Sequence, residues 1–144
     1  MNLKIKVIEE KMDRYNNYIR AIRWDKNIDQ KNIGVDWLIK KMVGAYIDEE
    51  LVGIGCIGKY YEGSKVNGDL TVLVNPNHRK KGVEDRLLSY MLNYSKEELK
   101  IEKVKATMLK TDLPSVSQYE RNDFDFVSFD DKSITFEKKL KKTR

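Results

Sequence analysis

The chain has 144 residues, of which 40% are hydrophobic and 35% are charged, a balance that indicates one folded domain over 1–144 rather than a disordered polypeptide. Its formal net charge of +5 at pH 7 resides in the basic tail, residues 138–144, where basic side chains occur without an acidic one, so we interpret the tail as solvated and expect no nucleic-acid partner. No stretch reaches the roughly 20 apolar residues of a membrane span, and residues 1–10 lack the apolar centre of a signal peptide, which favours a cytoplasmic protein without a membrane partner.

The N-terminal part of the chain predicts one strand followed by two helices. Apolar and polar residues alternate over 3–7, which is typical of a strand exposed on one side. Residues 9–24 predict an amphipathic helix, and its apolar face would consist of Met12, Tyr15, Ile19 and Ile22. A polar loop over 25–34 then leads to a second, short helix predicted over 35–42.

Two strands are predicted next. Residues 42–47 and 51–59 are apolar runs on either side of the short turn 48–50, a pattern typical of an antiparallel hairpin. Cys56 lies within the second run, so we interpret it as a small core residue rather than a nucleophile. Because it is the only cysteine and His78 is the only histidine, the sequence predicts no disulfide framework and no metal site.

A strand, a basic turn and a helix follow the polar connection that is predicted over 60–67. An apolar run over 68–74 predicts a buried strand, and Pro76 ends it because proline has no N–H for a ladder hydrogen bond. Apolar residues at helical spacing predict a helix over 83–99. The N-terminus of this helix follows the basic turn, residues 79–82, and both features attract anions, so phosphate is the expected ligand class.

The C-terminal part completes a mixed sheet. Strand 102–109 is expected to lie parallel to strand 68–74, because the helix between them is long enough for a crossover connection. A short helix over 115–122 and a final pair of strands, 124–129 and 132–140, follow. The predicted fold class is therefore α+β (mixed α/β) in a single domain.

The basic turn resembles a known motif. Residues 79–84 run Arg-Lys-Lys-Gly-Val-Glu, which is similar to the acyl-CoA-binding motif of the GNAT superfamily of N-acyltransferases: Gln or Arg, two residues, Gly, one residue, then Gly or Ala. The preceding Val74-Asn75-Pro76 also matches the strand and proline that lead into this turn in the family. Glu84 departs from the pattern, at the point where the pyrophosphate of the coenzyme would lie against the backbone.

A second segment is similar to the same family. Residues 112–124 resemble the stretch that runs from an Asn to Leu-Tyr-Glu-Lys-Leu-Gly-Phe, and the residues in register are Tyr119, Glu120, Arg121 and Phe124. The departures are Asp112, Gln118 and Asp123. Together with the element order, the resemblance covers nearly the whole chain. It implies a GNAT-like fold with a central, mostly antiparallel sheet and one parallel pair after the coenzyme-binding strand, turn and helix.

The resemblance also implies where acetyl-CoA, the expected co-substrate, would bind. The backbone of Leu73 and Val74 would pair with the pantetheine arm, and Tyr119 would give a proton to the departing thiolate. Asp112 takes the position of the family's Asn and is expected at the coenzyme. The pyrophosphate cradle would consist of Arg79, Lys80, Lys81, Gly82, Val83 and Glu84.

Several groups are candidates for the base that removes a proton from the acceptor. Asp69, at the start of strand 68–74, is the nearest carboxylate, with Glu62 behind it, and either would act through water. His78 adjoins the basic turn and is interpreted as a turn residue rather than a base. Acidic residues in the loop 25–34 and the turn 130–131 would suit a cationic amine, although such residues also serve simply to keep loops soluble.

The leading hypothesis is an acetyl-CoA-dependent N-acetyltransferase that acts on a primary amine of an unknown small molecule or protein by direct transfer, without a metal. The alternative is a catalytically impaired GNAT-fold domain that binds CoA or regulates, suggested by Glu84, Asp112 and Asp123. A third hypothesis is a binder of nucleic acid or of an anionic surface that acts through the basic tail. The oligomeric state is left open, with a homodimer among the options.

Overall fold

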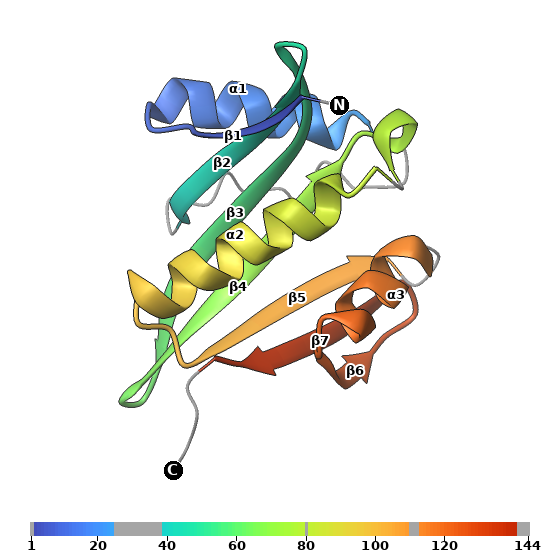
Figure 1. The fold of residues 1–144 in the computed structure, drawn as a ribbon. Helices are drawn as coiled ribbons and strands as arrows, with labels where there is room; N and C mark the ends of the chain where they lie inside the picture. The colour runs from blue at the N-terminus through green and yellow to red at the C-terminus, as the bar shows by residue number, and fades with distance from the viewer. Residues whose placement is uncertain (1, 25–38, 80, 110–112, 141–144) are drawn as a thin grey trace.

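The computed structural model describes residues 2–24, 39–79, 81–109 and 113–140 (Figure 1). The described residues form a seven-stranded sheet of order β1-β2-β3-β4-β5-β7-β6. Its strands are β1 (Leu3–Val7), β2 (Ile39–Ile47), β3 (Glu50–Glu62), β4 (Lys65–Val74), β5 (Lys103–Leu109), β6 (Asp125–Phe129) and β7 (Ser133–Lys139). The helices are α1 (Lys11–Ile22), α2 (Val83–Glu97) and α3 (Leu113–Arg121), and the short 3-10 helix η2 (Pro76–His78) follows β4.

The strand pairing confirms the predicted fold class. Every neighbouring pair of strands is antiparallel except β4 and β5, which are parallel across the α2 crossover. The predicted strand, turn and helix are confirmed as well, because β4 ends at Val74 and α2 begins at Val83. The turn before α2 thus lies at the end of β4, where the chain leaves the sheet (Figure 1).

The second helix predicted over 35–42 is wrong over its last part. Residues 35–38 lie outside the described residues, and Ile39 to Met42 belong to β2 rather than to a helix. Met42 is fully buried and pairs with Cys56 of β3. Pairing with a long central strand therefore outweighs the helical spacing of a short apolar run.

The polar connection predicted over 60–67 is also wrong, because these residues form the end of a hairpin. The pairing of β3 with β4 continues as far as Glu62 and Lys65. Gly63 follows with φ of 62°, a left-handed conformation that glycine adopts without steric cost. A tight turn therefore joins two longer strands, and residues 61–65 form the exposed tip of this hairpin.

Helices cover both faces of the sheet. Leu87 and Met91 of α2 pack into the main core on one face, while Ala21 of α1 packs on the other (Figure 1). Two glycines of β3 allow the close approach of α2. A methyl group placed on Gly53 would lie 2.8 Å from Leu87 Cδ1, and one on Gly55 would lie 2.9 Å from Met91 Cγ.

The apolar face predicted for α1 is only partly correct. Met12 and Tyr15 are 65% and 46% exposed, whereas Ala21 and Ile22 are almost completely buried. The helix therefore meets the sheet through its C-terminal turn. Helical periodicity predicts which residues share a face, but it does not predict how far along the helix that face is covered.

β4 and β5 separate before either strand ends. Their parallel pairing stops at Leu70 and Ala106, while β4 continues through 71–74 and β5 through 107–109. These two segments pair with β3 and β7 but not with each other, and we call the place where they diverge the β4–β5 separation. Figure 1 shows the two strands diverging, with α2 beside β4 and α3 beside β5. The edge of β4 that faces the separation has backbone groups that the ladder with β5 does not use.

Candidate active site

The direction of each backbone group along β4 follows from hydrogen bonds at its two ends. The carbonyl oxygen of Val66 accepts a 2.8 Å hydrogen bond from the β5 side, and the amide of Asn75 donates a 2.8 Å hydrogen bond to the β3 side. Successive residues of a strand alternate between its two edges. Val72 and Val74 therefore direct their N–H and C=O groups into the β4–β5 separation.

The backbone of Leu73 is directed the other way, toward β3, where Leu73 pairs with Ile54. Of the two residues predicted to offer backbone groups to a coenzyme, Val74 therefore faces the separation and Leu73 does not, while Val72 also faces it. Sequence reasoning missed Val72 because hydrophobic alternation indicates only where side chains point. The edge that a backbone group faces depends on the register with both neighbouring strands.

The chain between β4 and α2 is shaped by a short turn and by Gly82. Asn75 Oδ1 accepts a 3.0 Å hydrogen bond from the Asn77 amide, which closes the turn after β4. Gly82, the N-cap of α2, has φ of 79°, and a methyl group placed on it would meet nothing within 4 Å. Glycine therefore serves here through its backbone conformation and not through a lack of space. It offers no side chain to cap the first helical amides, which have no acceptor inside the helix.

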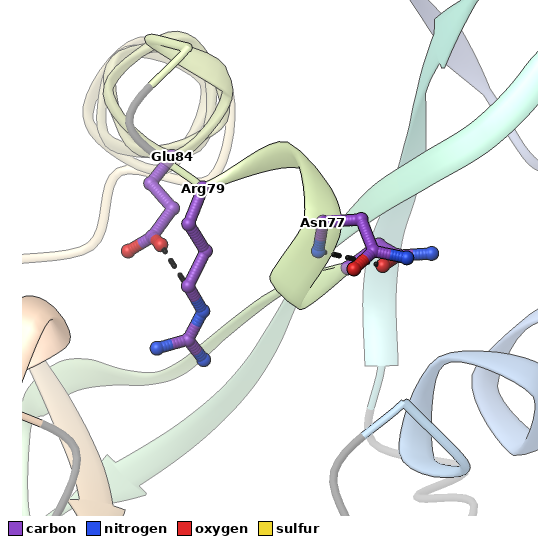
Figure 2. A network of polar contacts seen from close by, with 4 residues as sticks. Asn77, Arg79 and Glu84 are labelled. Atoms are coloured by element: carbon purple, nitrogen blue, oxygen red, sulfur yellow. Dashed lines mark hydrogen bonds and ion pairs between the residues drawn. The ribbon is translucent and has the colours of Figure 1, made fainter.

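Charged side chains at this turn contact one another. Arg79 Nε lies 3.9 Å from Glu84 Oε1, with exposed side-chain fractions of 24% and 14%, and both side chains extend on the same side of the turn (Figure 2). The Glu84 carboxylate therefore offsets part of the positive charge of Arg79. His78 Nδ1 lies 3.5 Å from Lys81 Nζ, which places His78 in the turn, as predicted. Lys80 lies outside the described residues.

Tyr119 of α3 is held in an aromatic cluster. It is 5% exposed, and its ring meets Phe124 edge to face with a centroid separation of 4.9 Å. It also stacks on Phe136 of β7 at 6.5 Å. Such contacts restrict the ring because aromatic pairs favour particular geometries. Asp112, the other residue predicted in this segment, lies outside the described residues.

The two candidate bases lie close to one tyrosine. Asp69 is exposed and directly precedes Leu70, the last residue of β4 that pairs with β5. The pKa of the Tyr60 hydroxyl is raised, first by burial and then by the Asp69 and Glu62 carboxylates. Sequence reasoning did not single out Tyr60, because the hairpin that carries it was expected to be a loop.

The turn between β6 and β7 uses one of its acidic residues structurally. Asp130 Oδ1 accepts hydrogen bonds from the amides of Lys132 at 2.9 Å and Ser133 at 2.8 Å. This carboxylate therefore closes the hairpin, as Asp often does in turns. The acidic loop 25–34, the other candidate contact for a cationic amine, lies outside the described residues.

Cys56 is a core residue, as predicted. It is 3% exposed, and burial raises the pKa of its thiol to about 12, so the thiol is protonated at neutral pH. Within the described part of the chain, no three His, Cys, Asp or Glu side chains are grouped so that they could hold a metal ion. None of the described helices is long and apolar enough to cross a membrane.

Known proteins share this fold. The ribosomal-protein-S18-alanine N-acetyltransferase from Escherichia coli matches with a TM-score of 0.75 at 11% identity, over 99% of this chain and 97% of that one. The Staphylococcus aureus Mu50 N-acetyltransferase matches with a TM-score of 0.71 at 14% identity, over 98% of this chain and 100% of that one. Campylobacter jejuni N-acetyltransferase PseH, in complex with acetyl coenzyme A, matches with a TM-score of 0.61 at 18% identity, over 96% of this chain and 99% of that one. Identities this low establish the fold alone.

The family assignment comes from the sequence. No curated protein matches the chain. The model of the acetyltransferase (GNAT) family, however, matches residues 8–124, which include the basic turn, the β4–β5 separation and Tyr119. This match extends over most of the chain and includes β4, the basic turn, α2 and α3. The chain belongs to the GNAT family of acetyltransferases.

Proposed function

We propose that this acyltransferase moves the acetyl group of acetyl-CoA to a primary amine of a small molecule or protein, by direct transfer within a ternary complex. The observation that carries the proposal is the β4–β5 separation, because η2 and the basic turn lead from this end of β4 to the N-terminus of α2, where the N-cap residue Gly82 has no side chain. An extended, amide-containing arm and an anionic end group are the ligand parts that suit these two features.

Acetyl-CoA supplies the acetyl group as an activated thioester, and the chain offers a site for each part of it. Val72 and Val74 direct backbone groups into the separation, where they suit the amides of the pantetheine arm. The positive charge of the basic turn and the backbone amides in the first turn of α2 suit the pyrophosphate. The proposed coenzyme contacts beyond these two valines are Arg79, Lys80, Lys81, Gly82, Val83, Glu84 and Asp112.

The chemistry proposed for the side chains concerns two protons. As the amine nitrogen bonds to the thioester carbonyl carbon and the carbon–sulfur bond breaks, Asp69 takes the proton from that nitrogen through water. Tyr119 gives its hydroxyl proton to the departing sulfur. No covalent enzyme intermediate is required, and the buried, protonated Cys56 is unsuited to form one.

The alternative of an impaired coenzyme-binding domain is not supported. Its main motivation was Glu84, whose carboxylate would repel a pyrophosphate if it pointed freely into the cradle. In the structure this carboxylate lies 3.9 Å from Arg79 Nε (Figure 2). Its charge is therefore partly compensated by a neighbour.

Calorimetry and a turnover assay test the proposal directly. The purified protein is titrated with acetyl-CoA, and free-thiol release is then followed with a panel of primary amines. We expect saturable binding, amine-dependent thiol release and acetylated product detected by mass spectrometry. Absence of both binding heat and thiol release across the panel would overturn the proposed function.

Replacing Glu84 with alanine is expected to tighten acetyl-CoA binding by about fivefold, or ~1 kcal/mol. The change removes a carboxylate beside Arg79 and leaves the full guanidinium charge for the pyrophosphate. Calorimetry on the variant measures this shift. Glu97→Ala is the matched control, because it removes an exposed carboxylate from the opposite end of α2. Equal effects of the two substitutions would show that only the net charge of the helix matters.

A further inference from the structure

The β4–β5 separation divides the site into two sides that are joined again by polar side chains. One side consists of β4, η2 and α2, and the other consists of β5 and α3 (Figure 1). Asp85, in the first turn of α2, accepts a hydrogen bond through Oδ1 from Gln118 Nε2 of α3. Asn122 Nδ2 lies 3.5 Å from the same oxygen. These contacts therefore link α2 and α3 at a level where β4 and β5 no longer pair with each other.

We propose that Asp85 and Gln118 form a latch across the β4–β5 separation that sets the position of Tyr119. The proposal rests on the proposed function, in which Tyr119 gives a proton to the leaving sulfur. Asp85 and Gln118 are positioning residues, because they act on the reaction only through α3. Gln118 is also one of the departures from the family pattern, which has a Leu at this position.

The contacts of α3 show why the latch would control Tyr119. On the β7 side, the ring of Tyr119 stacks on Phe136, and Lys138 Nζ donates a 2.7 Å hydrogen bond to the carbonyl of Asn122 just after the helix. On the α2 side, Asp85 contacts Gln118 of the helix and Asn122 just after it. Gln118 directly precedes Tyr119, so a shift of its side chain moves the adjacent backbone.

The burial of Gln118 gives the latch its strength. Only 6% of Gln118 is exposed, and a buried amide is costly without a hydrogen-bond partner. A carboxylate acceptor makes this bond stronger than one between neutral groups. Asp85 directly follows Glu84 in the helix turn of the proposed pyrophosphate cradle. The latch therefore connects the N-terminus of α2, which is proposed to bind acetyl-CoA, to α3, which carries Tyr119.

The test removes the donor of the latch while keeping the volume of the side chain. Gln118→Met is expected to lower kcat about tenfold, or ~1.4 kcal/mol, with an acetyl-CoA KM that stays within about twofold. Asp85→Ala should have the same effect, and the double variant should be no worse than either single one. Asp85→Asn, which keeps an acceptor oxygen, should restore most of the activity. Ser117→Ala, an exposed change on α3, is the control.

Hydrogen exchange of the α3 amides provides a readout that does not depend on activity. Loss of the latch should speed exchange in α3 and leave α2 unchanged. Unchanged kcat and unchanged exchange in Gln118→Met would overturn the proposal, and so would strictly additive losses in the double variant. If the wild-type protein shows no acetyl transfer, the proposed function fails, yet the exchange experiment still decides whether the latch holds α3.

Discussion

Tyr119→Phe is expected to lower kcat about 100-fold while the KM for acetyl-CoA stays within about twofold. The substitution removes only the hydroxyl that is proposed to protonate the departing sulfur. The ring remains, and with it the edge-to-face contact with Phe124 at 4.9 Å and the stacking on Phe136 at 6.5 Å. Packing should therefore be preserved, and the loss should appear in the chemical step. Steady-state kinetics with the best amine of the panel measures both constants.

A second tyrosine provides the control for this substitution. Tyr90 lies on α2 and is partly buried against the main core, so Tyr90→Phe makes the same chemical change on another helix. We expect it to leave kcat unchanged. Thermal unfolding of both variants checks that the fold is intact. If Tyr119→Phe retained wild-type kcat at an unchanged melting temperature, the proton would have to come from another donor, and the role of α3 would need a different explanation.

The local part of the site could be predicted from the sequence because its rules are local. Pro76 ends β4, since proline has no amide hydrogen to offer the ladder. Gly82 adopts a φ of 79°, and the helix begins at the next residue. The parallel pairing of β4 and β5 follows from the length of the crossover between them. The end of β4 and the start of α2 depend on neighbouring residues and the parallel pairing depends on the chain order, and the structure confirms these three predictions.

The wrong predictions concern segments whose structure depends on distant partners. Ile39 to Met42 have spacing that suits a helix, but a long central strand is available for pairing and takes them into the sheet. Within residues 60–67, residues 61–65 are exposed at the tip of the β3–β4 hairpin, where polar side chains face water. Composition alone does not separate such a tip from a loop. Tyr60 was overlooked as a consequence, although it lies beside both candidate bases.

Orientation within the site required the register of the whole sheet. The alternation of side chains in β4 is evident in the sequence. Whether the backbone groups of Val72 or those of Leu73 point toward β3, however, depends on the register of the two strands. The pairing of Arg79 with Glu84 and of Asp85 with Gln118 is equally invisible, since it depends on rotamers and on the distance between two helices. Sequence therefore indicates candidate residues but not the partners that those residues contact.

Gly53→Val is expected to destabilise the protein by about 3 kcal/mol and to weaken acetyl-CoA binding about tenfold. A methyl group at this position already lies 2.8 Å from Leu87 Cδ1 and 3.2 Å from Val83 Cγ1. It also lies 3.2 Å from the carbonyl oxygen of Leu73, so the strand cannot move aside. Because the side chains of Leu87 and Val83 are almost completely buried, we expect them to move together with α2, whose first residue is Val83. Denaturant unfolding measures the stability, and calorimetry measures the binding.

Two further variants separate crowding from backbone strain. Gly53→Ala should lose less stability and less acetyl-CoA affinity than Gly53→Val, because alanine adds only the Cβ atom. Gly63→Ala should cost about 1 kcal/mol from its φ of 62° and leave acetyl-CoA affinity unchanged, since nothing lies within 4 Å of the added methyl group. Wild-type affinity in a destabilised Gly53→Val protein would show that the coenzyme does not sense the position of α2. The anion site would then have to be sought outside the helix N-terminus.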